Sequence, residues 1–405
     1  MIKEKYINKN IDSNVTICEN TISCFNKINA ENYSYRVYEK GMVGIFYHQG
    51  NDIKEQGYAN AEKKLILRRS YPFELEKGIR HRDKSESPLS DKQLIETANE
   101  LLHFFANFYP QFTFSGTIGT HIWKEGIINT KGMDYSCKDA NSYIDLKFKH
   151  KDSKNLQDGR IFFTQRTFHN NLFYNVCNNI LQNFTKQLTM SEYCLIVDSY
   201  HQYTSFLEYS LSLEQILTGK SLLSNKLHKK VFSEKLTVFH DVSDENCWMN
   251  TFWDGDGVVN EKDKIIYINK GKLLHGSCGK RIAQKYGYKT TGNEGINYMD
   301  IPSGSYNTMN IKSENKTIKE LLNGRVGIIP IQAEGGGFSS DGSYVMPVQT
   351  GLLTDGDKIL GQVPPFSIIS NLFDMFGESF IGVSKFDTNI FNNKALIFEC
   401  KFGNI

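Results

Sequence analysis

The distribution of glycine changes near residue 190, and this change limits the fold more than any other feature of the sequence. In the second half, glycines separate short apolar runs such as KIIYIN, RVGIIPIQ, SYVMPVQT and ALIFECKF, a pattern typical of short strands joined by tight turns. The first half mixes strand patterns with long helical patterns. We therefore expect an α+β protein, with a mixed N-terminal α/β-layer domain at residues 1–190 and a β-rich C-terminal domain at residues 191–405.

Three segments of the first half have a clear period. The stretch SDKQLIETANELLHFFANFY, residues 90–109, predicts a core helix, because Ser90 and Gln93 form a capping box ahead of an apolar stripe. The stretch YRVYEKGMVGIFYHQG, residues 35–50, predicts a hairpin that turns at Gly41. The stretch HNNLFYNVCNNILQNFTKQLTM, residues 169–190, predicts a second helix, and YCLIVDSY after it predicts a strand.

The charge balance excludes several classes of partner. The chain has 47 basic and 45 acidic side chains and a net charge of +2, so no global field draws it to nucleic acid or to an anionic membrane. The basic runs KLHKK and IRHRDK lack the interleaved aromatic residues that stack bases, and we interpret them as solvated faces. No apolar run approaches the roughly 18 residues of a membrane span, and the first residues lack a signal-peptide core. We expect a cytoplasmic protein whose eight cysteines are free thiols.

The common catalytic and ligand-binding motifs are incomplete. The triplet at residues 219–221 reads Gly-Lys-Ser but has Glu214 where a P-loop needs glycine. The acidic stretch at residues 254–257 is not followed by the ligands of an EF-hand loop, which favours a structural turn. His275 and Cys278 make only half of a zinc site. The residues by themselves therefore indicate no recognisable active site.

Four stretches of the second half nevertheless follow the order of a known family's motifs. GKSLLSNKLHKKV is similar to a G-x-S-x-x-x-x-K-x-G region, with His228 or Lys229 where glycine is usual, and TFWDGDGVV resembles a "DDEG" turn. INKGKLLHGSCGKRIAQKYGYKTTGN is similar to a hairpin and short helix that end in "TGN", and AEGGGFSSDGSYVMPVQTGLLTDGDKILGQVPPFSIISNL resembles a segment that ends in "I-x-G-N-L". GIINTKGMDYS, residues 126–136, and the hairpin at residues 36–44 add weaker support. The chain thus resembles the TldD/TldE (PmbA) family, which also carries the label "modulator of DNA gyrase".

The resemblance directs attention to one helix. In the TldD branch this helix carries H-E-x-x-x-H, in which two histidines bind zinc and the glutamate acts as general base, and a distal cysteine completes the ligands. Counting back from Gly219 places the motif on Thr204, Ser205 and Tyr209. These three positions hold neither the ligands nor the base.

A second register for the same motif begins at His201 and fails as well. It places Gln202 at the position of the base and Phe206 at the position of the second histidine, and an amide does not accept a proton near neutral pH. Cys400 lies in a terminal alternating strand, outside the C-x-K-x-G context of the family's ligand. The resemblance therefore implies the TldE/PmbA-like branch, with no catalytic residue, no metal ligand and no cofactor of its own.

For such a chain the family implies a non-catalytic subunit of a heterodimeric TldD/TldE-type zinc metalloprotease, with the zinc in the TldD-type partner. The pair would process or degrade unfolded or modified peptides, held as an added β-strand. A homodimer is compatible with the chain in isolation. Two glycine turns are candidates for peptide binding or for a purely structural role, and their residues are Asp254, Gly255, Asp256, Gly257, Gly335, Gly336 and Gly337.

Two alternatives from other classes stay open at this point. The chain could be a stand-alone metallopeptidase with a divergent site around His240, His275 and Cys278, and bound zinc in the purified protein would indicate this. It could also be a binding protein that modulates DNA gyrase, which a pull-down would detect.

Overall fold

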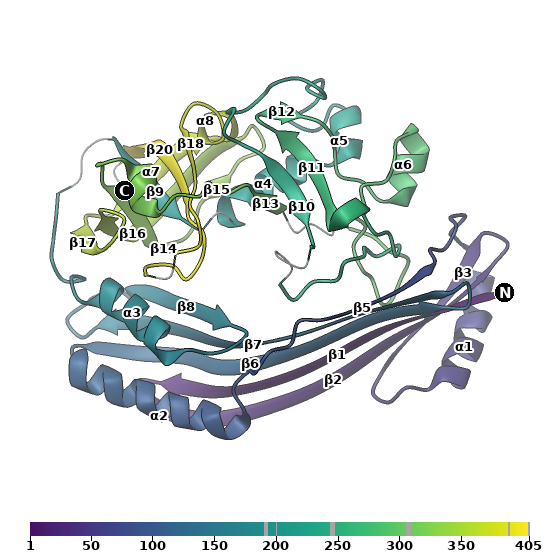
Figure 1. Ribbon diagram of the computed structural model, residues 1–405, viewed down its shortest axis with the longest axis horizontal. Coiled ribbons are helices and arrows are strands. Elements are labelled where there is room, and N and C mark those ends of the chain that lie inside the picture. Colours follow the sequence, from purple (N-terminus) through teal and green to yellow (C-terminus); the bar gives the residue numbers. More distant parts are fainter. Residues whose placement is uncertain (190–192, 200, 244–247, 305–308, 388, 404–405) are drawn as a thin grey trace.

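The protein is α+β, as predicted. The computed structural model describes residues 1–189, 193–199, 201–243, 248–304, 309–387 and 389–403. A long curved sheet from the first half forms one layer, and the second half rests against the concave face of this sheet (Figure 1). Within the described residues, no helix combines the length and the apolar character needed to cross a membrane.

Two long antiparallel hairpins build the N-terminal sheet. Their strands contain 17 to 19 residues each, which corresponds to roughly 55–60 Å of extended chain. The strand order is β4-β3-β2-β1-β6-β7-β5, and β8 also pairs with β7. The strands are β1 (Ile2–Cys18), β2 (Thr21–Glu39), β3 (Met42–Gln49), β4 (Arg69–Ser70), β5 (Gly78–Asp83), β6 (Phe112–Asn129), β7 (Met133–His150) and β8 (Gly159–Gln165).

The predicted hairpin at residues 35–50 is confirmed as the pair β2 and β3. Its turn places Lys40 at φ 49° and Gly41 at φ 73°, the two positive values that a tight hairpin turn requires. The turn between β6 and β7 lies in the segment GIINTKGMDYS, residues 126–136, which resembles another turn of the family. There Asn129 Oδ1 accepts from the amides of Lys131 and Met133, at 2.9 and 3.1 Å, and Gly132 has φ 99°.

The helices of the first half are α1 (Lys54–Lys63), the 3-10 turn η1 (Lys64–Leu67), α2 (Asp91–Phe108) and α3 (Asn170–Leu181). Helix α2 confirms the prediction for residues 90–109, because Ser90 and Gln93 form the expected capping box. Helix α3 begins where predicted but ends at Leu181, and Phe184 beyond its end still packs in the core. Apolar residues at helical spacing therefore continue beyond the last residue of the helix, and the predicted helix was too long at this end.

The second half is rich in strands, as predicted. One sheet has the order β12-β11-β10-β13, and the larger one has the order β14-β9-β20-β18-β16-β15, with β17 on β16 and β19 on β20. An additional pairing of β14 with β16 closes a ring of strands. The strands are β9 (Tyr193–Asp198), β10 (Val238–Asp241), β11 (Lys264–Asn269), β12 (Lys272–Leu273), β13 (Met309–Ile311), β14 (Gly327–Ala333), β15 (Gly337–Phe338), β16 (Ser343–Thr354), β17 (Ile359–Val363), β18 (Phe366–Asn371), β19 (Phe380–Val383) and β20 (Leu396–Gly403).

Short helices connect these strands. They are α4 (His201–Ser210), α5 (Leu213–Leu217), η2 (Glu261–Asp263), α6 (Lys280–Tyr286), α7 (Ile318–Leu322) and α8 (Leu372–Met375). Helix α5 ends next to Gly219, which has φ 78°. The triplet at residues 219–221 is therefore the end of a helix, in agreement with the rejection of a P-loop.

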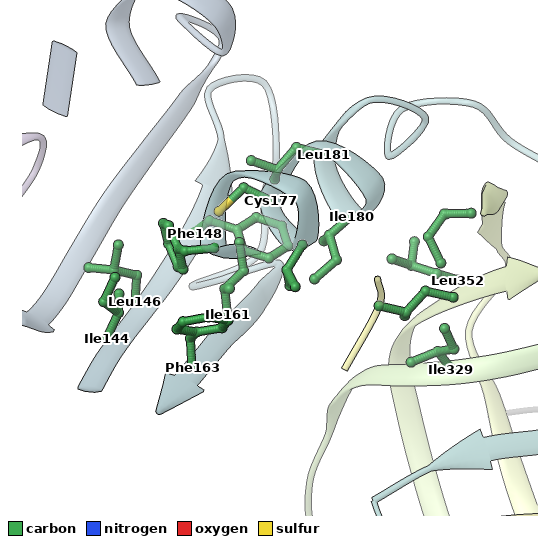
Figure 2. Packing of buried hydrophobic residues seen from close by; sticks show 14 of the residues in the cluster. Ile144, Leu146, Phe148, Ile161, Phe163, Cys177, Ile180, Leu181, Ile329 and Leu352 are labelled. Atoms are coloured by element: carbon green, nitrogen blue, oxygen red, sulfur yellow. The ribbon is translucent and has the colours of Figure 1, made fainter. Parts of the chain in front are cut away.

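One large hydrophobic cluster joins the two halves. Figure 2 shows Ile144 and Phe163 of the long sheet, Ile180 of α3, and Ile329 and Leu352 of the second half in one cluster. This cluster joins residues from both sides of position 190, whereas a second large cluster is built from second-half residues alone. The predicted boundary falls on residues 190–192, which lie outside the described residues, and the division into two domains stays a prediction.

The basic run IRHRDK is a solvated face only in part, because His81 and Asp83 are exposed but Arg82 is buried. The Arg82 side chain is 5% exposed and lies 3.1 Å from Asp263 Oδ2, and Arg80 pairs with the same carboxylate. Both guanidinium groups lie over the ring of Phe252, at 4.2 and 5.1 Å from its centre. These partners belong to the second half of the chain, so the sequence around the run could not reveal them.

Candidate functional site

A cleft of about 1210 Å³ lies between the long sheet and the second half. Strands β6, β7 and β8 contribute one wall, and the end of β9, helix α4, β13 and β14 contribute the other. The volume exceeds the usual range of a small-molecule pocket.

Two strand edges border the cleft. Strand β8 pairs with β7, and strand β13 pairs with β10, and among the described residues no strand pairs with the other edge of either. Residues of both strands line the cleft, including Phe162 of β8 and Met309 of β13. At one end of β8 the Asn392 side-chain amide donates to the Thr164 carbonyl at 3.1 Å. An open strand edge is where an extended peptide can add as a further strand.

Asp198 is the most deeply buried acid of the cleft. It ends β9 and is 7% exposed. Its carboxylate accepts from the Ser199 amide at 2.6 Å, from the Tyr203 hydroxyl at 3.0 Å, and from the Gln202 side chain. Burial raises the pKa of Asp198 to about 7, although these hydrogen bonds partly oppose the shift. The carboxyl group therefore changes protonation state near neutral pH.

Helix α4 contributes Glu208 to the same cleft. Burial raises the pKa of Glu208 to about 7. Glu208 and Asp198 lie in segments whose motifs were noted above, but neither residue was among the predicted site residues. One feature of the sequence could have indicated them: each acid stands directly after, or within, an apolar run. A buried, unpaired carboxylate is costly at such a position, so an acid there often has a functional role.

The three positions of the former metal motif do not line this cleft. Thr204 is 1% exposed, whereas Ser205 is exposed and Tyr209 is 58% exposed. Ser205 and Tyr209, four residues apart, therefore lie on the exposed face of α4, and Thr204 lies on its buried side. The side chain of His201, which begins the helix, lies outside the described residues.

Charged and aromatic side chains of the long sheet form the opposite wall. His121 Nδ1 contacts Asp12 Oδ1, and Arg160 Nη2 lies 2.6 Å from Asp145 Oδ2. His121, Asp12 and Arg160 all line the cleft, together with Tyr143. The wall therefore carries both signs of charge and many hydrogen-bonding groups, and no single charge dominates it.

The acidic turn at residues 254–257 lies elsewhere, at the contact between the two halves. Asp254 is 1% exposed, and its two oxygens accept from the amides of Asp256, Val258 and Glu294 at 2.9, 2.9 and 3.0 Å. Burial, together with the nearby charge of Asp256, raises the pKa of Asp254 to about 8. Because amide donors occupy both oxygens, this geometry favours a structural turn over a cation site.

Residues of the first half hold this turn in place. The Tyr71 hydroxyl donates to Asp256 Oδ1 at 2.7 Å, and the Tyr6 hydroxyl donates to the Gly255 carbonyl. The Gly255 amide donates to the Glu294 carbonyl at 2.7 Å. Gly257 has φ 77°, so a positive φ at this glycine is as expected. Hydrogen bonds to this turn therefore link the long sheet to the second half.

The glycines at 335–337 permit a close approach within the chain itself. Gly335 and Gly337 have φ values of 85° and 151°. A Cβ atom on Gly336 would lie 2.1 Å from the Val345 carbonyl oxygen of β16. None of these glycines lines the cleft. Their backbone approaches the neighbouring hairpin, which favours the structural interpretation of this turn.

The residues of the alternative metal site do not assemble. Among the described residues, no group of three or more histidine, cysteine, aspartate or glutamate side chains could hold a metal ion. His240 is 1% exposed, and burial lowers its pKa to about 4. Cys278 is also buried, beside Thr291, and burial raises the pKa of its thiol. His240, His275 and Cys278 therefore support no zinc centre in the part of the chain that the structure describes.

Comparison with known proteins identifies the second half. Residues 200–394 match the family model of the PmbA/TldA metallopeptidase C-terminal domain. This part of the chain belongs to the PmbA/TldD family. The resemblance found in the sequence motifs is thereby confirmed.

Solved structures share the fold of the whole chain. TldE from Thermococcus kodakarensis matches with a TM-score of 0.80 and 16% identity, over 100% of this chain and 97% of that chain. A Thermotoga maritima MSB8 protein, proposed as a modulator of a DNA gyrase, matches with a TM-score of 0.77 and 17% identity, over 99% and 96%. At these identities the likeness shows a common fold.

A curated relative from Methanocaldococcus jannaschii, whose function is uncharacterised, is 21% identical over 282 residues. The alignment covers 65% of this chain and 63% of that protein, and therefore less than two thirds of the relative's length.

The structure also explains one departure from the PmbA/TldD pattern. Glycine is usual at the end of the G-x-S-x-x-x-x-K-x-G region, and either His228 or Lys229 was the candidate for that position. His228 has φ 65°, in the left-handed region that favours glycine. Its amide donates to the Leu273 carbonyl at 2.7 Å. His228 is therefore the residue that replaces the glycine.

Proposed function

We propose that this chain is a TldE/PmbA-like, non-catalytic subunit of a heterodimeric TldD/TldE-type zinc metalloprotease that processes or degrades unfolded or modified peptides in the cytoplasm. The observation that carries this proposal is the cleft of about 1210 Å³ with two open strand edges. The zinc and the general base belong to the TldD-type partner. This chain holds the peptide.

The chemistry of the cleft suits a polypeptide of variable sequence. An open edge binds backbone amides and carbonyls, which every peptide has, so it holds many sequences in an extended form. Phe162 is 53% exposed and offers apolar surface to the side chains of a bound peptide. Asp198 and Glu208 accept hydrogen bonds from peptide amides when ionised, and they can also donate one when protonated. Folded proteins lack the free backbone that such binding requires.

The proposal is tested by co-expression with a TldD-type protein, followed by sizing and by cleavage of an unstructured peptide. The two chains should co-elute, and replacing the partner's general base should abolish cleavage. Chelation should stop cleavage by the pair, whereas this chain alone should hydrolyse nothing. Chelator-sensitive cleavage by this chain alone, or failure of the two chains to co-elute, would overturn the proposal.

Phe162→Arg tests whether the cleft holds the substrate. The longer, charged side chain should block the edge of β8 and raise the KM of the assembled pair about tenfold, with a smaller effect on kcat. The matched control is Phe108→Arg, because Phe108 is 67% exposed at the end of α2, away from the residues that line the cleft. Equal KM values for the two variants would place peptide binding elsewhere.

A further inference from the structure

The pairing of β6, β7 and β8 fixes which backbone groups of β8 are free. Strands β6 and β7 pair without a register shift, and the bond from the Lys151 amide to the Gln111 carbonyl, at 2.9 Å, continues their ladder. Backbone groups alternate in direction along a strand. Odd-numbered residues of β7 therefore direct their amides and carbonyls to β6, and even-numbered residues direct theirs to β8.

Arg160 and Phe162 have their backbone groups on the open side of β8. Strands β7 and β8 also pair without a register shift, and Ile161 and Phe163 lie opposite even-numbered residues of β7. The amides and carbonyls of Ile161 and Phe163 are therefore used in the ladder. Those of Arg160 and Phe162 point to the edge that no described strand covers.

Both ends of this free stretch are closed. At one end, the buried Asn392 side chain donates to the Thr164 carbonyl at 3.1 Å, and this carbonyl points away from β7, as the alternation requires. At the other end, a Cβ atom on Gly159 would lie 2.3 Å from Ile331 Cγ2 of β14. A peptide strand can therefore pair only with residues 160–162.

The side chains of β8 alternate between two surroundings. The Arg160 and Phe162 side chains are each 53% exposed and face the cleft. Ile161 and Phe163 are each 1% exposed and pack in the cluster that contains α3. Figure 2 shows these two side chains beside α3, with Ile180 on the side of the helix that faces the second half. A strand added to this edge would present alternate side chains to the cleft and to the side of α3.

The side of α3 offers an apolar surface beyond the edge of β8. Val176 and Ile180 of α3, Ile329 and Ile331 of β14, and Ile390 all line the cleft. All but Ile331 belong to the cluster that contains α3, and Ile331 packs against that cluster. A peptide side chain on this side therefore meets hydrocarbon surface, where burial of an apolar group is favourable.

We propose that the edge of β8 selects extended peptides with apolar side chains two residues apart, on either side of the residue that pairs with Phe162. An antiparallel strand places both bonds of Phe162 on a single peptide residue, which suits so short an edge. Residues directly opposite each other share a face of the sheet. The two neighbours of that peptide residue therefore lie opposite Ile161 and Phe163, and their side chains turn toward α3. The occupant is the peptide substrate of the proposed function, on which this selection rests.

This spacing defines a class of substrate. Apolar side chains at alternate positions are typical of strand-forming segments, which become accessible when a protein unfolds. The peptide residue that pairs with Phe162 is less restricted, because its side chain lies on the cleft side. There the Arg160 guanidinium lies 5.6 Å from the centre of the Phe162 ring and pairs with Asp145. Selection therefore depends on the spacing of apolar residues more than on one residue type.

Two labelled peptides of equal composition test the spacing, with binding to this chain alone measured by fluorescence anisotropy. Both are serine-rich, and one contains Leu-Ser-Leu while the other contains Leu-Ser-Ser-Leu. In the second peptide the leucines fall on opposite faces of a strand, so only one of them reaches the side of α3. The first peptide should bind at least about tenfold more tightly. Equal affinities, or binding of neither peptide, would overturn the proposal.

The outcome is separate from that of the proposed function, because no partner is present in the binding assay. Equal affinities together with cleavage by the assembled pair would remove the spacing rule and leave the peptidase subunit intact. Failure of the two chains to co-elute would overturn the subunit role, whatever the two peptides show.

Backbone methylation of the Leu-Ser-Leu peptide tests the register. N-methylation of the central serine removes the donor to the Phe162 carbonyl and should weaken binding at least about tenfold. The amide of the following leucine points away from β8, so its N-methylation should change the affinity less than about twofold. Equal effects of the two methyl groups would refute pairing in this register.

Variants of the chain separate the edge from the apolar surface. Phe162→Pro removes the free amide at a position where an edge strand tolerates proline, and it should bind the Leu-Ser-Leu peptide at least about tenfold more weakly than Phe162→Ala, which keeps the amide. Ile331→Thr should reduce the preference between the two peptides severalfold, whereas Ile79→Thr on β5, a residue that is 75% exposed and outside the cleft, should not. Thermal melts should show that all four variants are folded. Equal binding by Phe162→Pro and Phe162→Ala, or an unchanged preference in Ile331→Thr, would contradict the proposal.

Discussion

At Gly255 the addition of one methyl group should be costly. A Cβ atom there would lie 2.3 Å from the Gly295 carbonyl oxygen and 2.7 Å from its carbon, and backbone cannot move aside as a flexible side chain can. The two segments must separate, which breaks the bond from the Gly255 amide to the Glu294 carbonyl and displaces the Glu294 amide from Asp254. A net hydrogen bond contributes about 1 kcal/mol, and a buried acceptor left unsatisfied costs about 1–3 kcal/mol more.

Gly255→Ala should therefore lower the free energy of unfolding by about 3–5 kcal/mol. Urea unfolding followed by circular dichroism measures this. For a chain of 405 residues, the same loss lowers Tm by about 4–6 °C. The control is Gly219→Ala, where φ is 78° but no atom lies within 4 Å of the added methyl group. It should cost only the left-handed backbone strain, about 1–2 kcal/mol. Equal losses for the two variants would show that the turn is not held against residues 294–295.

Three further outcomes are expected. The folded pKa of Asp198, about 7, lies above its ordinary 3.8, so the stability from this group is present below pH 4 and is lost as pH rises through 7. Relative to Asp198→Asn, the unmodified chain should lose up to about 4 kcal/mol of unfolding free energy between pH 4 and 8. Parallel stability profiles of the two proteins in urea unfolding would contradict this. His228→Gly should be neutral or stabilising by up to about 1 kcal/mol, because φ 65° favours glycine, and a clear loss in urea unfolding would show that the imidazole is needed. Calcium should leave Tm unchanged, because amides occupy both oxygens of Asp254, and a rise of several degrees would reverse this interpretation of the turn.

Local patterns predicted those elements whose causes are local. Helix α2 follows from the capping box at Ser90 and an apolar stripe, and the hairpin β2–β3 follows from alternation around Gly41. The great length of β1 and of the hairpin β6–β7 was not predicted. Many of their residues are partly exposed, so the apolar alternation that marks a strand is weak there. These strands are stabilised by their neighbours in the sheet.

In the candidate site, too, the sequence predicted local features but not the contacts between distant residues. The sequence indicated correctly that residues 254–257 form a turn, because acidic and glycine residues favour turns wherever they stand. It could not indicate the partners of that turn, since Tyr6 and Tyr71 lie far away in the chain. Nor could it indicate the cleft. Asp198 and Phe162 reach the same space only because the second half packs against the long sheet.

The sequence by itself determined the α+β class, the main helix, the glycine turns and, through its motifs, the PmbA/TldD family. These depend on short-range conformational preferences, which each segment carries with it. Only the tertiary structure decided that Arg82 is buried against Asp263, that Asp198 and Glu208 titrate near neutral pH, and that one edge of β8 pairs with no strand among the described residues. Burial, pKa and free strand edges depend on what packs nearby. That neighbourhood is set by contacts between residues far apart in the chain.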